Sequence, residues 1–206
     1  MDRQPIAIRP ASPTREDGLR FAHYVDIASE GKFRLLLGRR ASEILGTAFQ
    51  EPKHNLSYEN TLFAKLGGEI VGMATGYTAQ RHCEANDRAL MRAAGRSKLR
   101  IACMFALAAP VFRFLHTYEE GDFYVEFLAV DEAHRGKGIG SKLIEAMQER
   151  ALAAGSIHFA IDVAGRNESA RRLYERHGFT TINRWPKTRL VRPNILRMRK
   201  PLALDT

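Results

Sequence analysis

Cysteine is scarce in this sequence, and long hydrophobic runs are missing. Cys83 and Cys103 stand twenty residues apart, a spacing that suits neither a zinc site nor a disulfide framework. The longest uncharged apolar run, residues 101–112, includes Pro110 and is well short of the ~20 residues that span a bilayer. The first ten residues hold no apolar stretch typical of a secretory signal. We therefore expect a cytoplasmic protein with no membrane span.

A contiguous block of lysine and arginine is also missing, although the chain is strongly basic. Its 32 basic and 23 acidic residues give a formal net charge of +9, which suits nucleic acid, a membrane surface or a polyphosphate ligand. The nearest approach to a cluster falls in a predicted helix, and we interpret it as a solvated face: Arg88, Arg92, Arg96, Lys98 and Arg100. Nucleic acid is therefore disfavoured as a partner. The seven histidines form no metal-ligand pattern, so we expect no metal.

The order of predicted elements indicates a single α/β domain over residues 1–206, with a mixed central sheet flanked by helices. No internal repeat or linker divides the chain. Strands are expected at 6–11, 60–66, 70–79, 122–130, 157–164, 179–185 and 194–202. Helices are expected at 14–30, 33–50 and 141–154, from Asn167 to Gly178, and over much of 81–117 with breaks near Gly95 and Pro110.

The segment HRGKGIGSKLIEAM, residues 134–147, carries the strongest functional signal. Three of its glycines alternate with other residues between a buried strand and a helix. The first backbone N–H groups of a helix lack internal partners, and the helix dipole favours an anion. Glycines let a phosphate approach these N–H groups closely, and Arg135 and Lys137 add positive charge. The pattern predicts a site for a ligand that carries a pyrophosphate.

Two common pyrophosphate motifs fit poorly. A P-loop requires a glycine–lysine–serine/threonine sequence, which does not occur here. In a Rossmann fingerprint that starts at Gly136, the final glycine position is occupied by Ser141. Asp162 has the spacing of a ribose-binding acid, but the 44 residues that follow it are too few for a second mononucleotide-binding half.

RGKGIG resembles the R/Q-x-x-G-x-G/A signature of the GNAT superfamily of acetyl-CoA-dependent N-acetyltransferases. The downstream segment NESARRLYERHGF, residues 167–179, is similar to that superfamily's N-x-x-A-x-x-L-Y-x-x-x-G-F segment. The resemblance covers residues 122–179, and it implies the GNAT fold with a helical insertion, 81–117, before the cofactor-binding strand. Glu132 departs from the pattern, because many members have proline at this position.

The resemblance implies that acetyl-CoA is the co-substrate and assigns its contacts. Backbone groups of Leu128 and Val130 would bind the pantetheine arm, and Asn167 would reach the cofactor as well as cap its helix. The pyrophosphate would be held by the loop and first helical turn, namely Arg135, Gly136, Lys137, Gly138, Ile139, Gly140 and Ser141.

Two residues are candidates for catalysis. Tyr174 matches the family tyrosine that protonates the departing thiolate; the alternative is a tyrosine packed on the apolar face of its helix. Glu126 lies inside an apolar strand, where burial raises the pKa of a carboxylate, and it is the candidate base for an ammonium acceptor; the alternative is a structural salt bridge. The acceptor, a small-molecule or peptide amine, is not encoded in these motifs.

The expected activity is transfer of an acetyl group directly to a primary amine. The alternative function is a non-catalytic acyl-CoA-binding or regulatory module. An RNA-binding protein whose glycine loop holds backbone phosphate is a third interpretation, and a homodimer remains open.

Overall fold

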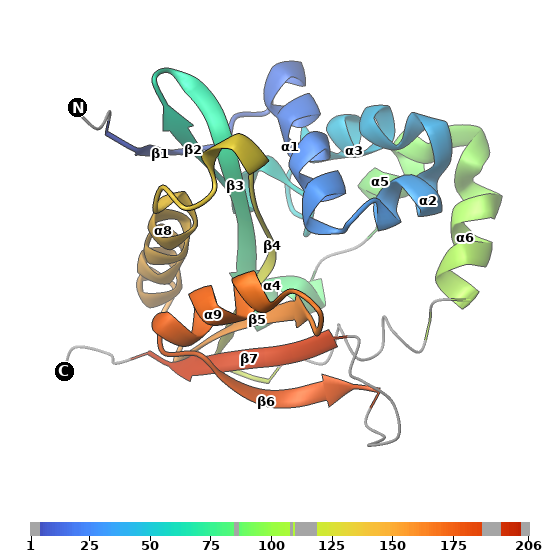
Figure 1. The fold of residues 1–206 in the computed structure, drawn as a ribbon. Coiled ribbons are helices and arrows are strands. Elements are labelled where there is room, and N and C mark those ends of the chain that lie inside the picture. Colours follow the sequence, from blue (N-terminus) through green and yellow to red (C-terminus); the bar gives the residue numbers. More distant parts are fainter. Residues whose placement is uncertain (1–4, 85–86, 108, 110–118, 187–194, 203–206) are drawn as a thin grey trace.

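The computed structural model describes residues 5–84, 87–107, 109, 119–186 and 195–202, and its elements are shown in Figure 1. The strands are β1 Ala7–Pro10, β2 Thr61–Leu66, β3 Glu69–Thr78, β4 Asp122–Val130, β5 His158–Ala164, β6 Thr180–Trp185 and β7 Ile195–Pro201. The α-helices are α1 Arg15–Ala28, α2 Lys32–Leu37, α3 Ala41–Phe49, α4 Ala79–Glu84, α5 Arg88–Ala94, α6 Lys98–Leu107, α8 Ile139–Ala153 and α9 Glu168–Arg176. Short 3-10 turns are η1 Gly38–Arg40, η2 Tyr58–Asn60, η3 Gly95–Ser97 and η4 Glu132–His134.

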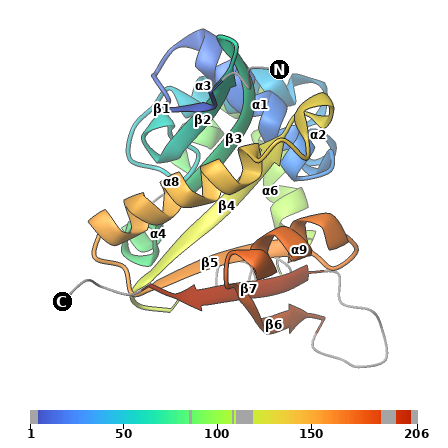
Figure 2. The same ribbon diagram turned by 60° about the vertical axis from the view of Figure 1, so that its left-hand side comes forward.

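The strands form one seven-stranded mixed sheet in the order β1-β2-β3-β4-β5-β7-β6. All neighbours are antiparallel except β4 and β5. Helix α8 is the crossover between these two parallel strands and lies against one face of the sheet (Figures 1 and 2). This arrangement confirms the predicted mixed α/β fold with flanking helices.

Two hydrophobic cores lie on opposite faces of the sheet. One core joins buried residues of α1, α2, α3, α5 and α6 to β2, β3 and β4, and includes Phe21, Phe49 and Phe127. The other joins α8 and α9 to the sheet, with Leu143 of α8 and Phe159 of β5 completely buried. Burial of this much apolar surface on both faces is the main stabilising contribution to such a fold.

The alternation of side chains between the two faces of strand β4 is shifted by one residue at Glu126. Thr75 of β3 pairs with Phe127 and Gly76 pairs with Val125, so Glu126 is the extra residue of a β-bulge. Val125 accordingly belongs to the core beneath α8, whereas Phe127 belongs to the core beneath α1. The bulge requires a close approach at Gly76, where an added Cβ would lie 2.6 Å from the ring of Phe123.

The sheet opens between its two parallel strands, immediately after this bulge. The pairing of β4 with β5 covers only Asp122–Val125 opposite His158–Ile161. Beyond these residues the edge of β4 that faces away from β3 has no strand partner in the described ranges. The two strands diverge there, and the opening lies next to the turn that begins α8 (Figure 2).

Most predicted elements are confirmed, and two predictions need correction. The helix expected over 33–50 is divided into α2 and α3 by η1, because Gly38 adopts a positive φ of 78° that ends α2. The helix expected to begin at 141 begins at Ile139. The predicted helical insertion consists of α4, α5, η3 and α6, with a break at Gly95 as expected; the break expected at Pro110 lies outside the described residues. No helix of the described residues is long and apolar enough to cross a membrane.

Candidate functional site

The first turn of α8 presents backbone donors to the predicted phosphate site. Gly138, in the left-handed conformation, is the N-cap and offers no capping side chain. The first helical hydrogen bond of this turn runs from the Lys142 N–H to the Gly138 carbonyl at 3.1 Å, so the N–H groups of residues 139–141 precede it. The buried side chain of Ile139 anchors the turn in the core, which leaves only its backbone for a ligand.

Open space lies beside two of the three glycines in this turn. Gly136 and Gly138 have φ angles of 75° and 85°, and a Cβ added to either would meet no atom within 4 Å. At Gly140 an added Cβ would lie 3.0 Å from Leu173 Cδ2, so this glycine allows α9 to approach α8. The residues present therefore fit a pyrophosphate group: two glycines leave room, helical N–H groups are available, and Arg135 and Lys137 are exposed nearby.

Asp131 connects this loop to α1 on the other face of the sheet. Its Oδ2 accepts a 2.9 Å hydrogen bond from the Tyr24 hydroxyl, which also lies 3.0 Å from the Ile70 carbonyl. Its Oδ1 lies 3.4 Å from His23 Nε2, and its own N–H donates to the Val71 carbonyl. Sequence reasoning missed this anchor, because Tyr24 and Asp131 are 107 residues apart in the chain.

The residues predicted to bind the pantetheine arm lie along the opening of the sheet. Leu128 and Val130 are half-buried and pack against the core beneath α8. The Val130 carbonyl is 3.3 Å from Arg135 Nε, so the strand end and the loop contact each other directly. Asn167 caps α9 as predicted, since its Oδ1 accepts from the Ala170 N–H at 3.0 Å. The cofactor roles of these residues stay predictions.

Glu126 combines partial exposure of the residue with burial of its carboxylate. Its Oε2 is buried and makes no hydrogen bond within the part of the chain that the structure describes. Burial raises the pKa of Glu126 to about 7; the nearby hydroxyl of Tyr77 opposes this rise and the charge of Asp87 adds to it. The structure therefore shows no salt bridge for Glu126 in the described ranges, and a carboxyl of this pKa exchanges its proton near neutral pH.

Tyr174 is only 4% exposed and packs in the core beneath α8 and α9, with its ring centroid 5.9 Å from that of Phe179. Burial raises its pKa, so the phenol keeps its proton at neutral pH. Both sequence interpretations agree with this position, because a packed ring can still hold its hydroxyl at the opening of the sheet. The catalytic role of Tyr174 stays a prediction.

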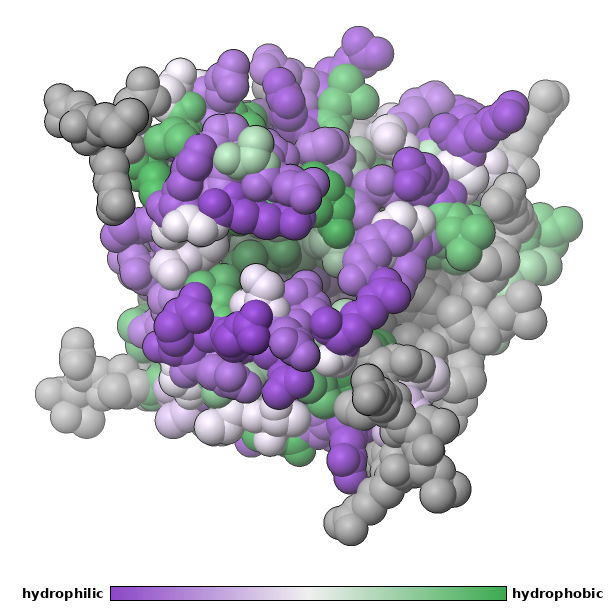
Figure 3. All heavy atoms as spheres, in the orientation of Figure 1, coloured by the Kyte–Doolittle hydropathy of each residue, from purple (hydrophilic) through white to green (hydrophobic). Residues whose placement is uncertain are grey.

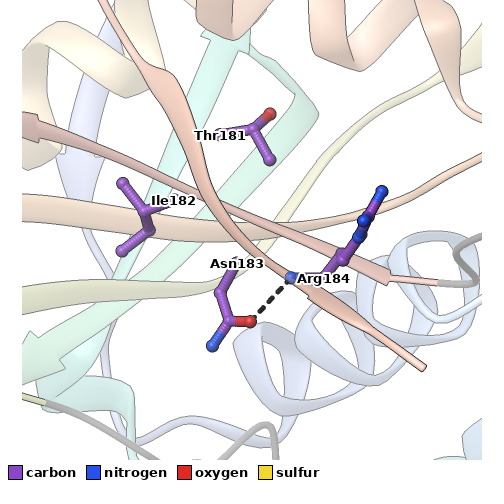
Figure 4. A pocket seen from close by; sticks show the side chains of 4 residues that line it. All are labelled: Thr181, Ile182, Asn183 and Arg184. Atoms are coloured by element: carbon purple, nitrogen blue, oxygen red, sulfur yellow. Dashed lines mark hydrogen bonds between the residues drawn. The ribbon is translucent and has the colours of Figure 1, made fainter. Parts of the chain in front are cut away.

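The surface is hollowed over this region. Figure 3 shows a depression with a hydrophobic floor and a hydrophilic border, between α1 and α8 on one side and α9 on the other. A second hollow lies on the edge strand β6 and is lined by Thr181, Ile182, Asn183 and Arg184 (Figure 4). None of the predicted site residues lines this second hollow. Among the described residues no group of histidine, cysteine, aspartate and glutamate is arranged to hold a metal ion.

A mixed sheet that opens between its parallel strands, beside a glycine-rich helix N-terminus, is the α/β arrangement that the sequence resemblance implies. The chain belongs to the acetyltransferase (GNAT) family, because residues 32–179 match the model of that family. The general reaction of this family is acetyl-CoA-dependent acetyl transfer. The match confirms the predicted family and, with it, the enzyme class of acetyltransferase.

Individual relatives agree with this assignment. An acetyltransferase of Agrobacterium fabrum (strain C58) is 45% identical over 62 residues, which cover 30% of this chain and 44% of the relative. The match thus spans under half of that relative's length. A crystal structure of an acetyltransferase aligns over 96% of this chain and 100% of its own, with 26% identity and a TM-score of 0.66. An N-acetyltransferase from Staphylococcus aureus Mu50 aligns over 94% and 100%, with 16% identity and a TM-score of 0.64, a likeness in fold alone.

Proposed function

We propose that this protein transfers an acetyl group from acetyl-CoA directly to a primary amine of a small molecule or peptide. The observation that carries the proposal is the position of Glu126. Its carboxylate, with a pKa of about 7, stands at the bulge where the sheet opens, four residues before the end of the strand that leads into the phosphate loop. The proposed proton acceptor and the proposed pyrophosphate site would then lie on one strand and its continuation, which supports the proposal.

The cofactor would be held by the residues that the sequence predicts. Backbone N–H groups of 139–141 and the exposed side chains of Arg135 and Lys137 would neutralise the pyrophosphate. Backbone groups of Leu128 and Val130, at the unpaired edge of β4, would bind the pantetheine amides. When bound, acetyl-CoA supplies a thioester, an acyl group activated for attack by an amine.

Glu126 acts on the acceptor. An ammonium group has no free electron pair, so it must lose a proton before it can attack. The Glu126 carboxylate accepts that proton, directly or through a water molecule, and releases it to solvent. Because the pKa of this group is about 7, roughly half of it is deprotonated at neutral pH and ready to act as a base.

Tyr174 acts on the leaving group. When the carbon–sulfur bond breaks, the electron pair would leave on sulfur, and the phenol hydroxyl would donate a hydrogen bond to the departing thiolate, which then takes up a proton from solvent. A thiol has a reference pKa of ~8.5 and burial raises the pKa of Tyr174. Transfer to sulfur is therefore uphill, and the main contribution of the hydroxyl is a hydrogen bond to the developing thiolate.

Calorimetric titration with acetyl-CoA, with NADH and ATP as controls, tests the cofactor site first. Selective binding of acetyl-CoA supports the proposal and is followed by a screen of primary amines for acetyl transfer. The variant Tyr174→Phe then separates the two candidate functions. An enzyme should lose transfer while its affinity for acetyl-CoA stays nearly unchanged. A non-catalytic acyl-CoA-binding module should show binding without transfer, in the variant and the original protein alike.

The acceptor pocket would be shaped by the helices on the α1 face of the sheet. Helix α2 reaches β4 there, where Phe33 packs edge-on against Phe127 with ring centroids 5.6 Å apart. The inserted helices α4 and α5 approach the same strand from the side of Tyr77. Replacing the inserted segment, residues 81–117, by a short connection should therefore change which amines are acetylated. Unchanged acceptor choice in a folded variant would contradict this assignment.

A further inference from the structure

A buried ionic group joins three neighbouring strands on the face of the sheet away from α8. Asp162 of β5 accepts a 2.9 Å hydrogen bond from the Tyr124 hydroxyl of β4. Its two carboxylate oxygens also accept from Nε and Nη2 of Arg197 on β7, at 2.9 and 2.8 Å. The side chains of Asp162 and Arg197 are each 7% exposed. Because paired, charge-assisted hydrogen bonds are strong and directional, this one carboxylate ties β4, β5 and β7 together.

The group stands at the point where the sheet opens. Pairing of β4 with β5 ends at Val125 opposite Ile161. Asp162 is the first residue of β5 beyond this last pair, and Tyr124 is the residue of β4 just before it. If the pairing continued in the same register, Glu126 would come opposite Asp162, and like charges in directly opposite positions are destabilising. The Tyr124 hydroxyl thus reaches diagonally from the paired part of β4 to the first position of β5 at which the strands have separated.

Neighbouring side chains hold the Tyr124 ring on two sides. Arg197 Cζ lies 5.7 Å from the ring centroid, on the side of β7. The ring of Tyr77, which pairs with Tyr124 from β3, has its centroid 6.1 Å away. Tyr77 in turn lies parallel to His82 of α4, with ring centroids 5.6 Å apart and an interplanar angle of 13°. Both tyrosines are almost completely buried, so the Tyr124 hydroxyl has a fixed position from which to hold Asp162.

A second contact between arginine and aspartate lies at the other end of the paired stretch. Arg199 Nη1 lies 3.5 Å from Oδ1 of Asp122, the first residue of β4, and also contacts Glu119. Arg199 and Arg197 are two residues apart on β7, so their side chains lie on the same face. The two arginines therefore differ in position: Arg197 is next to the opening of the sheet, and Arg199 is next to its closed end.

We propose that Tyr124, Asp162 and Arg197 are positioning residues for acetyl-CoA: they join β4, β5 and β7 at the last strand pair and thereby hold the opening that receives the pantetheine arm. The inference rests on the proposed function, in which the backbone of β4 beyond the bulge binds this arm. Without the bond from Tyr124, the strand pair beside the opening would separate more readily. Binding of acetyl-CoA would then include the free-energy cost of ordering these strands.

Amide hydrogen exchange measured by NMR tests the link between the strands directly. The variant Tyr124→Phe keeps the packed ring and removes the hydroxyl that donates to Asp162. Amides in the paired stretch, residues 122–125 and 158–161, should then exchange about fivefold faster relative to amides of β2, because local opening is no longer opposed by this hydrogen bond. The same acceleration in all strands, or none in the paired stretch, would overturn the proposal.

Calorimetric titration with acetyl-CoA tests the consequence for the cofactor. Tyr124→Phe and Arg197→Lys should each weaken binding about 3–10-fold, since the lysine keeps the charge but cannot make the paired hydrogen bonds. Arg199→Lys is the matched control: it makes the same change on the same strand and face, at the closed end, and should alter the affinity by less than about twofold. Should Tyr124→Phe fail to fold, Arg197→Lys takes its place. Equal affinities of folded Arg197→Lys and Arg199→Lys would overturn the proposal.

Kinetics with a fixed primary amine separates positioning from a role in the chemical step. In Tyr124→Phe the KM for acetyl-CoA should rise, while kcat at saturating acetyl-CoA stays within about twofold of the original value. A fall in kcat at unchanged KM would overturn the proposal.

Failure of this inference and failure of the proposed function give different results. If the original protein does not bind acetyl-CoA, the proposed function fails, and the positioning role fails with it even where hydrogen exchange behaves as expected. If the original protein binds acetyl-CoA and transfers the acetyl group, but folded Tyr124→Phe binds acetyl-CoA equally well, the proposed function stands and this inference alone fails.

Discussion

Burial of the Glu126 carboxylate should make the free energy of unfolding fall as the pH rises. A single substitution should remove this dependence on pH. The pKa is raised from 4.5 to about 7 in the folded protein. Between these values the folded state keeps a proton that the unfolded state releases. The unfolded state then binds fewer protons, so the free energy of unfolding falls as the pH rises from about 4.5 to 7.

The size of the effect follows from the same shift. Each pKa unit corresponds to about 1.4 kcal/mol, so the shift of Glu126 amounts to about 3 kcal/mol. The residue keeps some contact with solvent, and we therefore expect about 2–3 kcal/mol. The glutamine in Glu126→Gln cannot ionise, so the free energy of placing a charge in a buried position is absent from this variant. It should match the original protein near pH 4.5 and exceed it in stability by about 2–3 kcal/mol above pH 7.

Urea unfolding at intervals from pH 4.5 to 8.5 measures this difference. Taking the difference between variant and original protein cancels the titration of all other groups that the substitution leaves unchanged. Glu69→Gln, at the exposed start of β3, controls for removal of a carboxyl as such and should change stability by less than about 0.5 kcal/mol. A difference for Glu126→Gln that does not vary with pH would refute the assignment of a buried carboxylate with a raised pKa.

Three further predictions concern the loop and the core. Tyr24→Phe leaves two partly buried acceptors without this donor and should cost about 1 kcal/mol in urea unfolding. Acetyl-CoA binding in calorimetry should also weaken, because the phosphate loop loses its anchor. Gly138→Ala should lower the free energy of unfolding by about 1–2 kcal/mol because of the positive φ at this position, and it should also weaken acetyl-CoA binding. Gly155→Ala is the control: its φ is 71° at the other end of α8, so it should lower stability without changing acetyl-CoA binding. Arg197→Met leaves the buried Asp162 carboxylate without its guanidinium partner and should lower the free energy of unfolding by about 3–5 kcal/mol. Much of this loss should be recovered when Asp162→Asn is added. Equal losses in the single and double variants would contradict this pairing.

The parts of the site that the sequence predicts are those built from neighbouring residues. The phosphate loop follows from a strand, alternating glycines and a helix start within about a dozen residues, and the structure places open space at Gly136 and Gly138. The cap by Asn167 is similarly local, because the side chain needs only an N–H group three residues ahead. Such features depend on the periodicity and chemistry of one segment, which a sequence displays directly.

The parts that the sequence does not predict join distant segments. Tyr24 meets Asp131 because α1 crosses the sheet above the end of β4, and no local pattern marks either residue as a partner of the other. His82 comes to lie on Tyr77 because the chain turns back directly after β3, where Thr78 Oγ1 accepts from the Arg81 N–H and begins α4. Gly38 was visible in the sequence, but its effect on α2 depends on a positive φ that packing selects.

The bulge at Glu126 shows how one extra residue organises the site. In a regular strand, Val125 and Phe127 would face the same core. Here they face opposite cores, so Leu128 and Val130 lie toward α8 and the predicted phosphate loop, while Glu126 lies toward Tyr77 and the inserted helices. The residues predicted to bind the cofactor and the residue proposed to act on the acceptor thereby lie on opposite faces of one strand.

Deletion of Glu126 tests the bulge itself, whereas its substitution tests only the carboxyl group. Deletion makes Val125 and Phe127 neighbours in a regular strand, and neighbouring strand residues face opposite sides of a sheet, so each keeps the core in which it is buried. The pairing of Thr75 with Phe127 and of Gly76 with Val125 is likewise retained. We therefore expect both Glu126→Gln and the deletion to give a folded protein, as measured by circular dichroism, with little transfer activity because the proposed base is lost. An unfolded deletion variant would show that the bulge is needed for more than the placement of this one side chain.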